Sequence, residues 1–174
     1  IAAEGPEAPV SLDVMLDMVS VGYDRSAVDK NEQYAAETVA NSKIALQKCQ
    51  AGKPSLTKAY GVFFPFKTKE DCASWMYFIQ AHFSDRSGQK KERLGYLFKA
   101  AQTGEKQKEI GIYTTIGQYY FDEADRIYQK YVADRKANDN VETDEMKTQL
   151  GLSRGNADRS IDAFGRAYKI ASCD

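Results

Sequence analysis

His82 is the only histidine of the chain, and it could join the thiols of Cys49, Cys72 and Cys173 in a metal site. Three cysteines and one histidine are a known ligand set for structural zinc. Such sites usually take their ligands from closely spaced pairs, and no Cys-x-x-Cys pair occurs here. Cys-x-x-Cys-His, which would attach a c-type haem, is missing as well. We therefore expect no metal site and no bound cofactor.

His82 also lacks the partners of a catalytic centre. No sequence motif marks a serine or cysteine nucleophile for it, and no glycine-rich phosphate loop is present. The Glu-x-x-His pairs of di-iron bundles are absent too. Asp122, Glu123 and Asp125 lie close together, but acids of this kind usually face solvent on a helix. We expect a half-buried packing or hydrogen-bonding role for His82, and no catalytic residues, so the chain is not expected to be an enzyme.

The three cysteines allow several interpretations. Cys72 falls on the apolar stripe of a predicted helix, where a free cysteine packs as a small hydrophobic residue. Cys49 and Cys173 lie near predicted helix ends and could form a disulfide with each other. A thioether link from a cysteine to a linear tetrapyrrole, as in algal antenna linkers, is a further alternative.

Composition excludes several classes of function. The net charge of −1 argues against nucleic-acid binding, which usually needs a basic surface. With 43% apolar and 28% charged residues, the chain has the composition of a soluble globular protein. No apolar run approaches the roughly 20 residues that cross a bilayer, which leaves peripheral membrane association open.

The start of the chain suggests processing. Residues 1–6 carry neither the basic nor the apolar region of a targeting segment, so we expect that such a segment has been removed. None of the asparagines stands in an Asn-x-Ser/Thr sequon, which gives no support to a glycosylated secreted protein. We therefore expect an organelle, with a plastid ahead of a mitochondrion.

Periodicity and capping signals predict helices throughout. Helices are expected over residues 11–19, 27–50, 69–86, 94–101, from 110 to a linker at 137–140, and 143–170. The last one is expected to be interrupted at Gly151 and Gly155, with Asn156 capping a separate helix. Gly22 should end the first helix, and Ser26 should cap the second. The predicted fold is all-α: an extended arm over residues 1–10, and a single domain over residues 11–174 formed by an antiparallel bundle of five or six helices.

Three apolar stripes support this assignment. The helix after residue 68 has one at Cys72, Trp75, Met76, Ile79 and Phe83. The next long helix has a heptad-like stripe at Ile110, Tyr113, Gly117, Tyr120, Ala124, Ile127 and Tyr131. The last helix repeats the pattern at Met146, Leu150, Ala157, Ile161, Phe164, Tyr168 and Ala171. We expect these stripes to form the core.

Aromatic residues outside these stripes indicate contact with another protein. Tyr60, Phe63, Phe64 and Phe66 surround Pro65, which prevents a regular helix and places them on an irregular, surface segment. We predict that they dock a partner; a segment folded back over the bundle end is the alternative.

Tyrosines on the long helix indicate the same role. The helix carries Tyr119, Tyr120, Tyr128 and Tyr131 on two adjoining faces, in addition to Tyr113. One face cannot bury them all, and tyrosine is enriched at protein–protein interfaces. We predict that one side of this helix contacts its own bundle and the other a partner; tyrosines that merely rim the core are the alternative.

These features favour a non-catalytic accessory or linker subunit that binds other protein subunits. In general type the chain resembles small helical extrinsic or linker subunits of photosynthetic and respiratory complexes in organelles, although no motif assigns it to a family. A helical module that encloses an apolar ligand or pigment is the alternative function.

Overall fold

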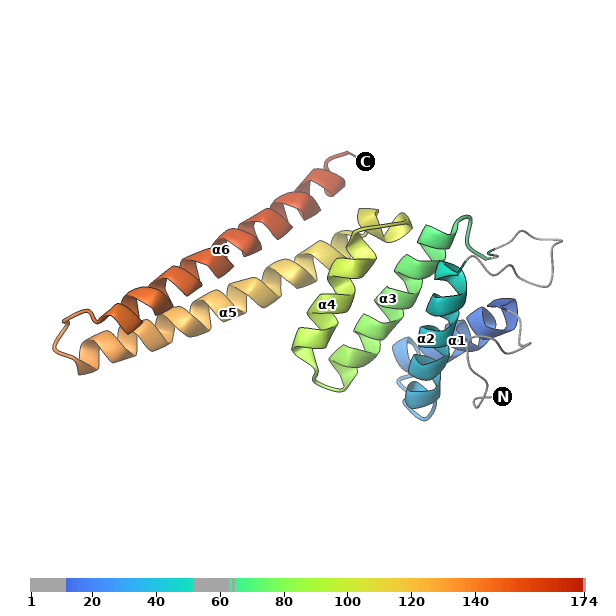
Figure 1. The fold of residues 1–174 in the computed structure, drawn as a ribbon, viewed down its shortest axis with the longest axis horizontal. Coiled ribbons are helices and arrows are strands. Elements are labelled where there is room, and N and C mark those ends of the chain that lie inside the picture. The colour runs from blue at the N-terminus through green and yellow to red at the C-terminus, as the bar shows by residue number, and fades with distance from the viewer. Residues whose placement is uncertain (1–11, 52–62, 64, 174) are drawn as a thin grey trace. The chain divides into compact units, whose positions relative to one another are not determined.

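The computed structural model describes residues 12–51, 63 and 65–173. In this part of the chain it has six α-helices, one short 3-10 helix and no strand, which confirms the predicted all-α fold (Figure 1). The predicted arm lies outside the described residues. The helices are α1 (Leu12–Ala27), α2 (Ala35–Gln50), α3 (Lys69–Arg86), α4 (Lys90–Ala101), η2 (Glu105–Lys108), α5 (Ile110–Ala137) and α6 (Asp144–Ala171).

The chain divides into two compact units, Ile1–Lys108 and Glu109–Asp174. The first unit contains α1 to α4 and η2, and the second contains α5 and α6. Whether both belong to one domain over residues 11–174 stays a prediction.

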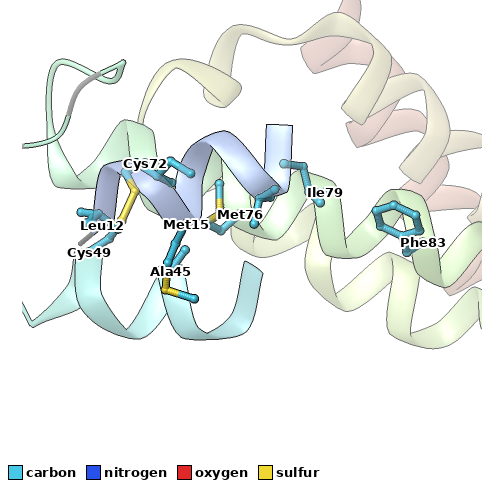
Figure 2. Close-up of a cluster of buried hydrophobic side chains, with 10 residues drawn as sticks. Leu12, Met15, Ala45, Cys49, Cys72, Met76, Ile79 and Phe83 are labelled. Carbon is cyan, nitrogen blue, oxygen red and sulfur yellow. A yellow bond between two sulfur atoms is a disulfide. The ribbon is translucent and has the colours of Figure 1, made fainter. Parts of the chain in front are cut away.

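The core of the first unit forms where α1, α2 and α3 meet (Figure 2). The apolar stripe predicted for α3 is confirmed at four of its five positions, and Trp75 is partly buried against the same cluster. The buried members are Leu12, Met15, Leu16 and Val19 from α1, Ala45 and Cys49 from α2, and Cys72, Met76, Ile79 and Phe83 from α3.

The boundary between the first two helices differs from the prediction. Gly22 does not end α1, and Ser26 does not cap α2, because α1 continues through both. Gly22 is needed for packing instead: a Cβ atom there would lie 1.9 Å from Oγ1 of Thr38 on α2. The chain turns only later, near Lys30, which has a left-handed φ of 57°.

The N-terminus of α3 forms as predicted. The Thr68 hydroxyl accepts a hydrogen bond from the Asp71 amide at 3.1 Å, as an N-cap residue does. The Asp71 carboxylate accepts one from the Glu105 amide at 2.8 Å, which ties η2 to α3. Gly104 comes just before with a φ of 65°, and a Cβ atom there would lie 2.6 Å from the Glu70 carbonyl oxygen. Only glycine fits this close approach.

The second unit is a helical hairpin. Its helices α5 and α6, each of 28 residues, run antiparallel and side by side (Figure 1). Asp139 and Asn140 in the turn both have positive φ, at 49° and 64°. Thr143 caps α6 by accepting a hydrogen bond from the Met146 amide at 3.3 Å. The long helix predicted from Ile110 is confirmed, although its first turns are rich in β-branched residues. Ile110 itself is exposed, contrary to the predicted stripe, and Ile112 and Ile116 are buried instead.

The predicted interruption of α6 is wrong. Gly151, Gly155 and Asn156 all lie within continuous helix, so Asn156 caps nothing. A glycine inside a helix costs about 1 kcal/mol relative to alanine. Packing against α5 along the whole length of the hairpin offsets that cost.

Candidate functional site

The closest approach to a catalytic arrangement lies between α1 and α3. The Ser26 hydroxyl lies 2.9 Å from Nε2 of His82 and 2.8 Å from a carboxylate oxygen of Glu32. Arg86 donates to the same carboxylate at 2.7 Å. A hydroxyl has one proton, and when Ser26 donates it to Glu32, the serine oxygen accepts a hydrogen bond from His82. In this arrangement His82 cannot act as a base on Ser26, which is also only 1% exposed.

The surroundings shift two pKa values in this network. Burial lowers the pKa of His82 below its ordinary value and outweighs the opposing charge of Glu32. For Glu32, burial alone would raise the pKa, but hydrogen bonds from Ser26 and Arg86 and the charge of Arg86 bring it below the ordinary value. Near neutral pH the network joins a neutral imidazole to a charged carboxylate.

We expect the stability of the first unit to fall as the pH drops below about 6.5, the pKa of histidine in an unfolded chain. Since the folded pKa of His82 is lower, the unfolded chain binds the proton first, and acid favours unfolding. His82→Gln keeps a hydrogen-bond donor but cannot titrate. Its urea midpoint should change less between about pH 7 and pH 5.5 than that of the wild type. Equal changes in both proteins would contradict this role of His82.

The cysteines pair differently from the prediction. Cys49 on α2 and Cys72 on α3 form a disulfide, and Cys173 is exposed and free (Figure 2). The possible bond between Cys49 and Cys173 is therefore excluded. Cys72 is buried, as expected, but it is not a free thiol. Among the described residues, no three His, Cys, Asp or Glu side chains are grouped so that they could hold a metal ion.

Two of the four predicted docking aromatics before α3 lie among the described residues. Phe63 and Phe66 are partly buried against the core of the first unit. The Phe66 ring lies 6.2 Å from that of Trp75, and its amide donates to the Phe63 carbonyl at 2.7 Å. These contacts are those of a segment folded back on its own helices. Tyr60 and Phe64 lie outside the described residues, and docking by this stretch stays a prediction.

The four predicted tyrosines of α5 form two ring pairs. Tyr131 is 5% exposed and donates a hydrogen bond to Glu142, and the Tyr128 ring stacks on it with centroids 6.0 Å apart. Tyr119 and Tyr120 form a T-shaped pair with centroids 5.5 Å apart. Helical periodicity places Tyr128 beside the stripe that faces α6 and Tyr119 on the opposite side of α5. Their part in partner binding stays a prediction.

Small residues fill the contact between α5 and α6. The hydroxyls of Ser153 and Ser160 donate to the carbonyl oxygens of Ala124 and Gly117 at 2.8 Å and 2.9 Å. These two bonds, one heptad apart on each helix, fix the register of the hairpin. The other small buried residues of α6 are Ala163 and Ala167. Such side chains let the backbones approach closely, although the larger Tyr131 and Met146 are buried as well.

Six large exposed apolar side chains lie on one outer side of the hairpin, here called the hairpin face. Each helix contributes three of them, all on the same rotational side of its buried stripe. Tyr128 and Phe164 lie nearest to the stripe, and the Phe164 ring packs over Gly117 of α5. Because the helices are antiparallel, the same rotational side of each is the same face of the pair. The members and their exposed fractions are Phe121 (56%), Tyr128 (46%), Val132 (42%), Ile161 (70%), Phe164 (37%) and Tyr168 (76%).

The opposite side of the hairpin is polar. Arg126 pairs with Glu123 at 2.8 Å, and Lys130 pairs with Asp134 at 2.6 Å. Gln149 crosses from α6 to Asp134 at 3.1 Å. The hairpin thus has one side on which six large apolar side chains are exposed and an opposite side that carries these ion pairs.

Part of the stripe predicted for α6 differs in the structure. Ile161, Tyr168 and Ala171 are exposed, and Phe164 is 37% exposed although its ring packs over Gly117 of α5. Phe121 and Val132 were not singled out from the sequence. A signal was available, since the serines and alanines of α6 recur at heptad spacing and mark the side that packs closely on α5.

The first unit contains a groove of about 790 Å³ between α2, α3 and α4. Val39 and Tyr96 line its walls, and Phe83 and Gln80 belong to α3 beneath them. Gln80 is 3% exposed, and its amide nitrogen has no hydrogen-bond partner among the described residues. Small-ligand sites combine apolar walls with a few polar groups, whereas the lining of this groove also includes the charged side chains of Glu32, Lys43, Arg86 and Glu92.

No known protein-family model matches the chain, and no curated protein or solved structure shows a significant similarity to it. Within the described ranges, no helix has both the length and the apolar character needed to cross a bilayer.

Proposed function

We propose that this chain is a non-catalytic accessory or linker subunit that docks into a larger protein assembly. The hairpin face carries the proposal, because it exposes six large apolar side chains on one side of a two-helix layer. Soluble monomers rarely leave contiguous apolar patches of this kind uncovered. Aromatic residues are also enriched where proteins meet.

The predicted tyrosines and aromatic stretch extend this docking surface. Tyr128 belongs to the hairpin face itself and stacks on Tyr131. Tyr119 and Tyr120, which lie away from the hairpin face on α5, would form a second aromatic surface for a partner. The stretch Tyr60–Phe66 adds a site on the first unit.

A photosynthetic or respiratory complex of an organelle is the proposed setting, with a plastid ahead of a mitochondrion. The bond between Cys49 and Cys72 supports a compartment that is not strongly reducing, because disulfides persist where thiols are oxidised.

We expect the hairpin face to hold the chain in its assembly. In native fractionation of an extract from the source organism, the tagged wild type should migrate far above the 19.5 kDa of one chain. Phe121→Ser combined with Ile161→Ser should shift it to a smaller species. Both side chains are more than half exposed. The free energy of unfolding of the double variant should therefore differ from that of the wild type by less than about 1 kcal/mol.

A matched control removes exposed apolar side chains from elsewhere on the second unit. Leu152 and Val141 are 58% and 63% exposed and lie outside the hairpin face. Leu152→Ser with Val141→Ser should leave the native size unchanged. The proposal fails when wild-type protein migrates as a single chain, or when both double variants keep the full native size.

Binding of an apolar ligand or pigment is a second candidate, favoured by the groove beside Gln80. Protein purified from its natural source would then carry absorption at wavelengths beyond the aromatic protein band. Two results together would contradict this candidate: an absorption spectrum with only the aromatic protein band, and no small molecule found by solvent extraction and mass spectrometry.

A further inference from the structure

We propose that the hairpin face is covered by a second copy of this chain, so that two hairpins form a four-helix bundle. The inference rests on the proposed function, because it names the protein that covers the face. A pair of helices with one apolar side lacks the second layer that a hydrophobic core needs. A second hairpin supplies that layer with the same sequence and the same spacing of apolar residues.

The size of the face fits a stable dimer. Each helix has 28 residues. At 1.5 Å per residue this gives a length of about 42 Å, and two helices side by side span about 20 Å. One whole side of the hairpin therefore measures about 800 Å², which is the area that each partner contributes to a standard protein–protein interface.

The charges on the face match in one arrangement of two copies. Asp125 on α5 and Arg154 on α6 are exposed and lie on the apolar side of the hairpin by helical periodicity. The serine hydrogen bond from Ser153 to Ala124 places both residues at the same level along the hairpin. Neither makes an ion pair with another described residue; Asp125 accepts a hydrogen bond only from Gln129, at 3.3 Å.

A two-fold axis parallel to the helices would bring these two opposite charges of the two copies together. It places α5 of one copy against α6 of the other, so that every helix has antiparallel neighbours, as in many four-helix bundles. Residues at the same level then meet, and Asp125 faces Arg154 of the partner subunit twice. The same operation stacks the apolar side chains of the two faces in the centre.

Light scattering during gel filtration of the purified full-length chain tests the inference. The wild type should have twice the 19.5 kDa mass of one chain. Phe121→Ser with Ile161→Ser should be monomeric, and the control Leu152→Ser with Val141→Ser should remain a dimer. A monomeric wild type at micromolar concentration would overturn the inference.

A charge exchange tests the arrangement. Asp125→Arg and Arg154→Asp should each weaken the dimer at least tenfold, because each brings like charges together twice. The double variant Asp125→Arg/Arg154→Asp should restore dimerisation, as judged by sedimentation equilibrium. If the double variant is weaker than either single one, this pairing is wrong.

The two proposals can fail separately. A monomeric wild type whose Phe121→Ser/Ile161→Ser variant still loses its large native complex would overturn the dimer and support docking to a different protein. A purified dimer that migrates only as a dimer in native extracts would support the second copy and contradict the larger assembly.

Discussion

Removal of the disulfide by Cys49→Ala with Cys72→Ala is expected to lower the free energy of unfolding of the first unit by about 3 kcal/mol. The bond links residues 23 positions apart and so restricts the unfolded chain. It also joins α2 to α3 inside the core, where both cysteines are 0% exposed (Figure 2). A loss of this size corresponds to a melting temperature lower by about 15 °C for a unit of this length.

Urea denaturation with and without a thiol reductant checks this expectation. Reductant should destabilise the wild type and leave the double variant unaffected. Cys173→Ala is the matched control, because it removes an exposed free thiol and should behave as the wild type does. Equal urea midpoints for the wild type in both conditions would show that the bond does not stabilise the folded chain.

Met76→Ala is expected to cost about 3 kcal/mol, because it leaves a cavity in the centre of the same core. Met76 is 1% exposed and packs among side chains from α1 and α2 (Figure 2). Met76→Leu keeps the volume and should cost less than about 1.5 kcal/mol.

Guanidinium denaturation of both variants, with the disulfide intact, measures this difference. The free energies of unfolding should rank wild type, then Met76→Leu, then Met76→Ala. An alanine variant as stable as the leucine variant would mean that the core collapses around the smaller side chain.

Much of the helical architecture could be predicted because it depends on local spacing. The stripe of α3 and the length of α5 follow from apolar residues three and four apart, and the caps at Thr68 and Thr143 from side chains that bond the next amides. The end of α1 could not be predicted, because Gly22 is required by Thr38, which belongs to another helix.

The candidate surfaces depended more on distant contacts. In α6 the largest apolar residues were assigned inward, whereas close contact with α5 requires the small ones. Likewise, Ser26 and His82 are 56 positions apart, and only the packing of α1 against α3 brings them to 2.9 Å. The partner of Cys49 was equally open, because spacing alone does not decide which of three cysteines pair.

Trp75, the single tryptophan of the chain, lies in the first unit and lets the unfolding of the two units be followed separately. The ammonium group of Lys106 lies 4.0 Å from the centre of the indole ring, and the rings of Tyr23 and Phe66 lie within 6.2 Å of it. Because the chain has one tryptophan, its fluorescence follows the first unit alone, while the circular dichroism of α5 and α6 adds the second. Superimposed fluorescence and dichroism transitions would mean that both units unfold together, and separate transitions would mean that the hairpin melts by itself.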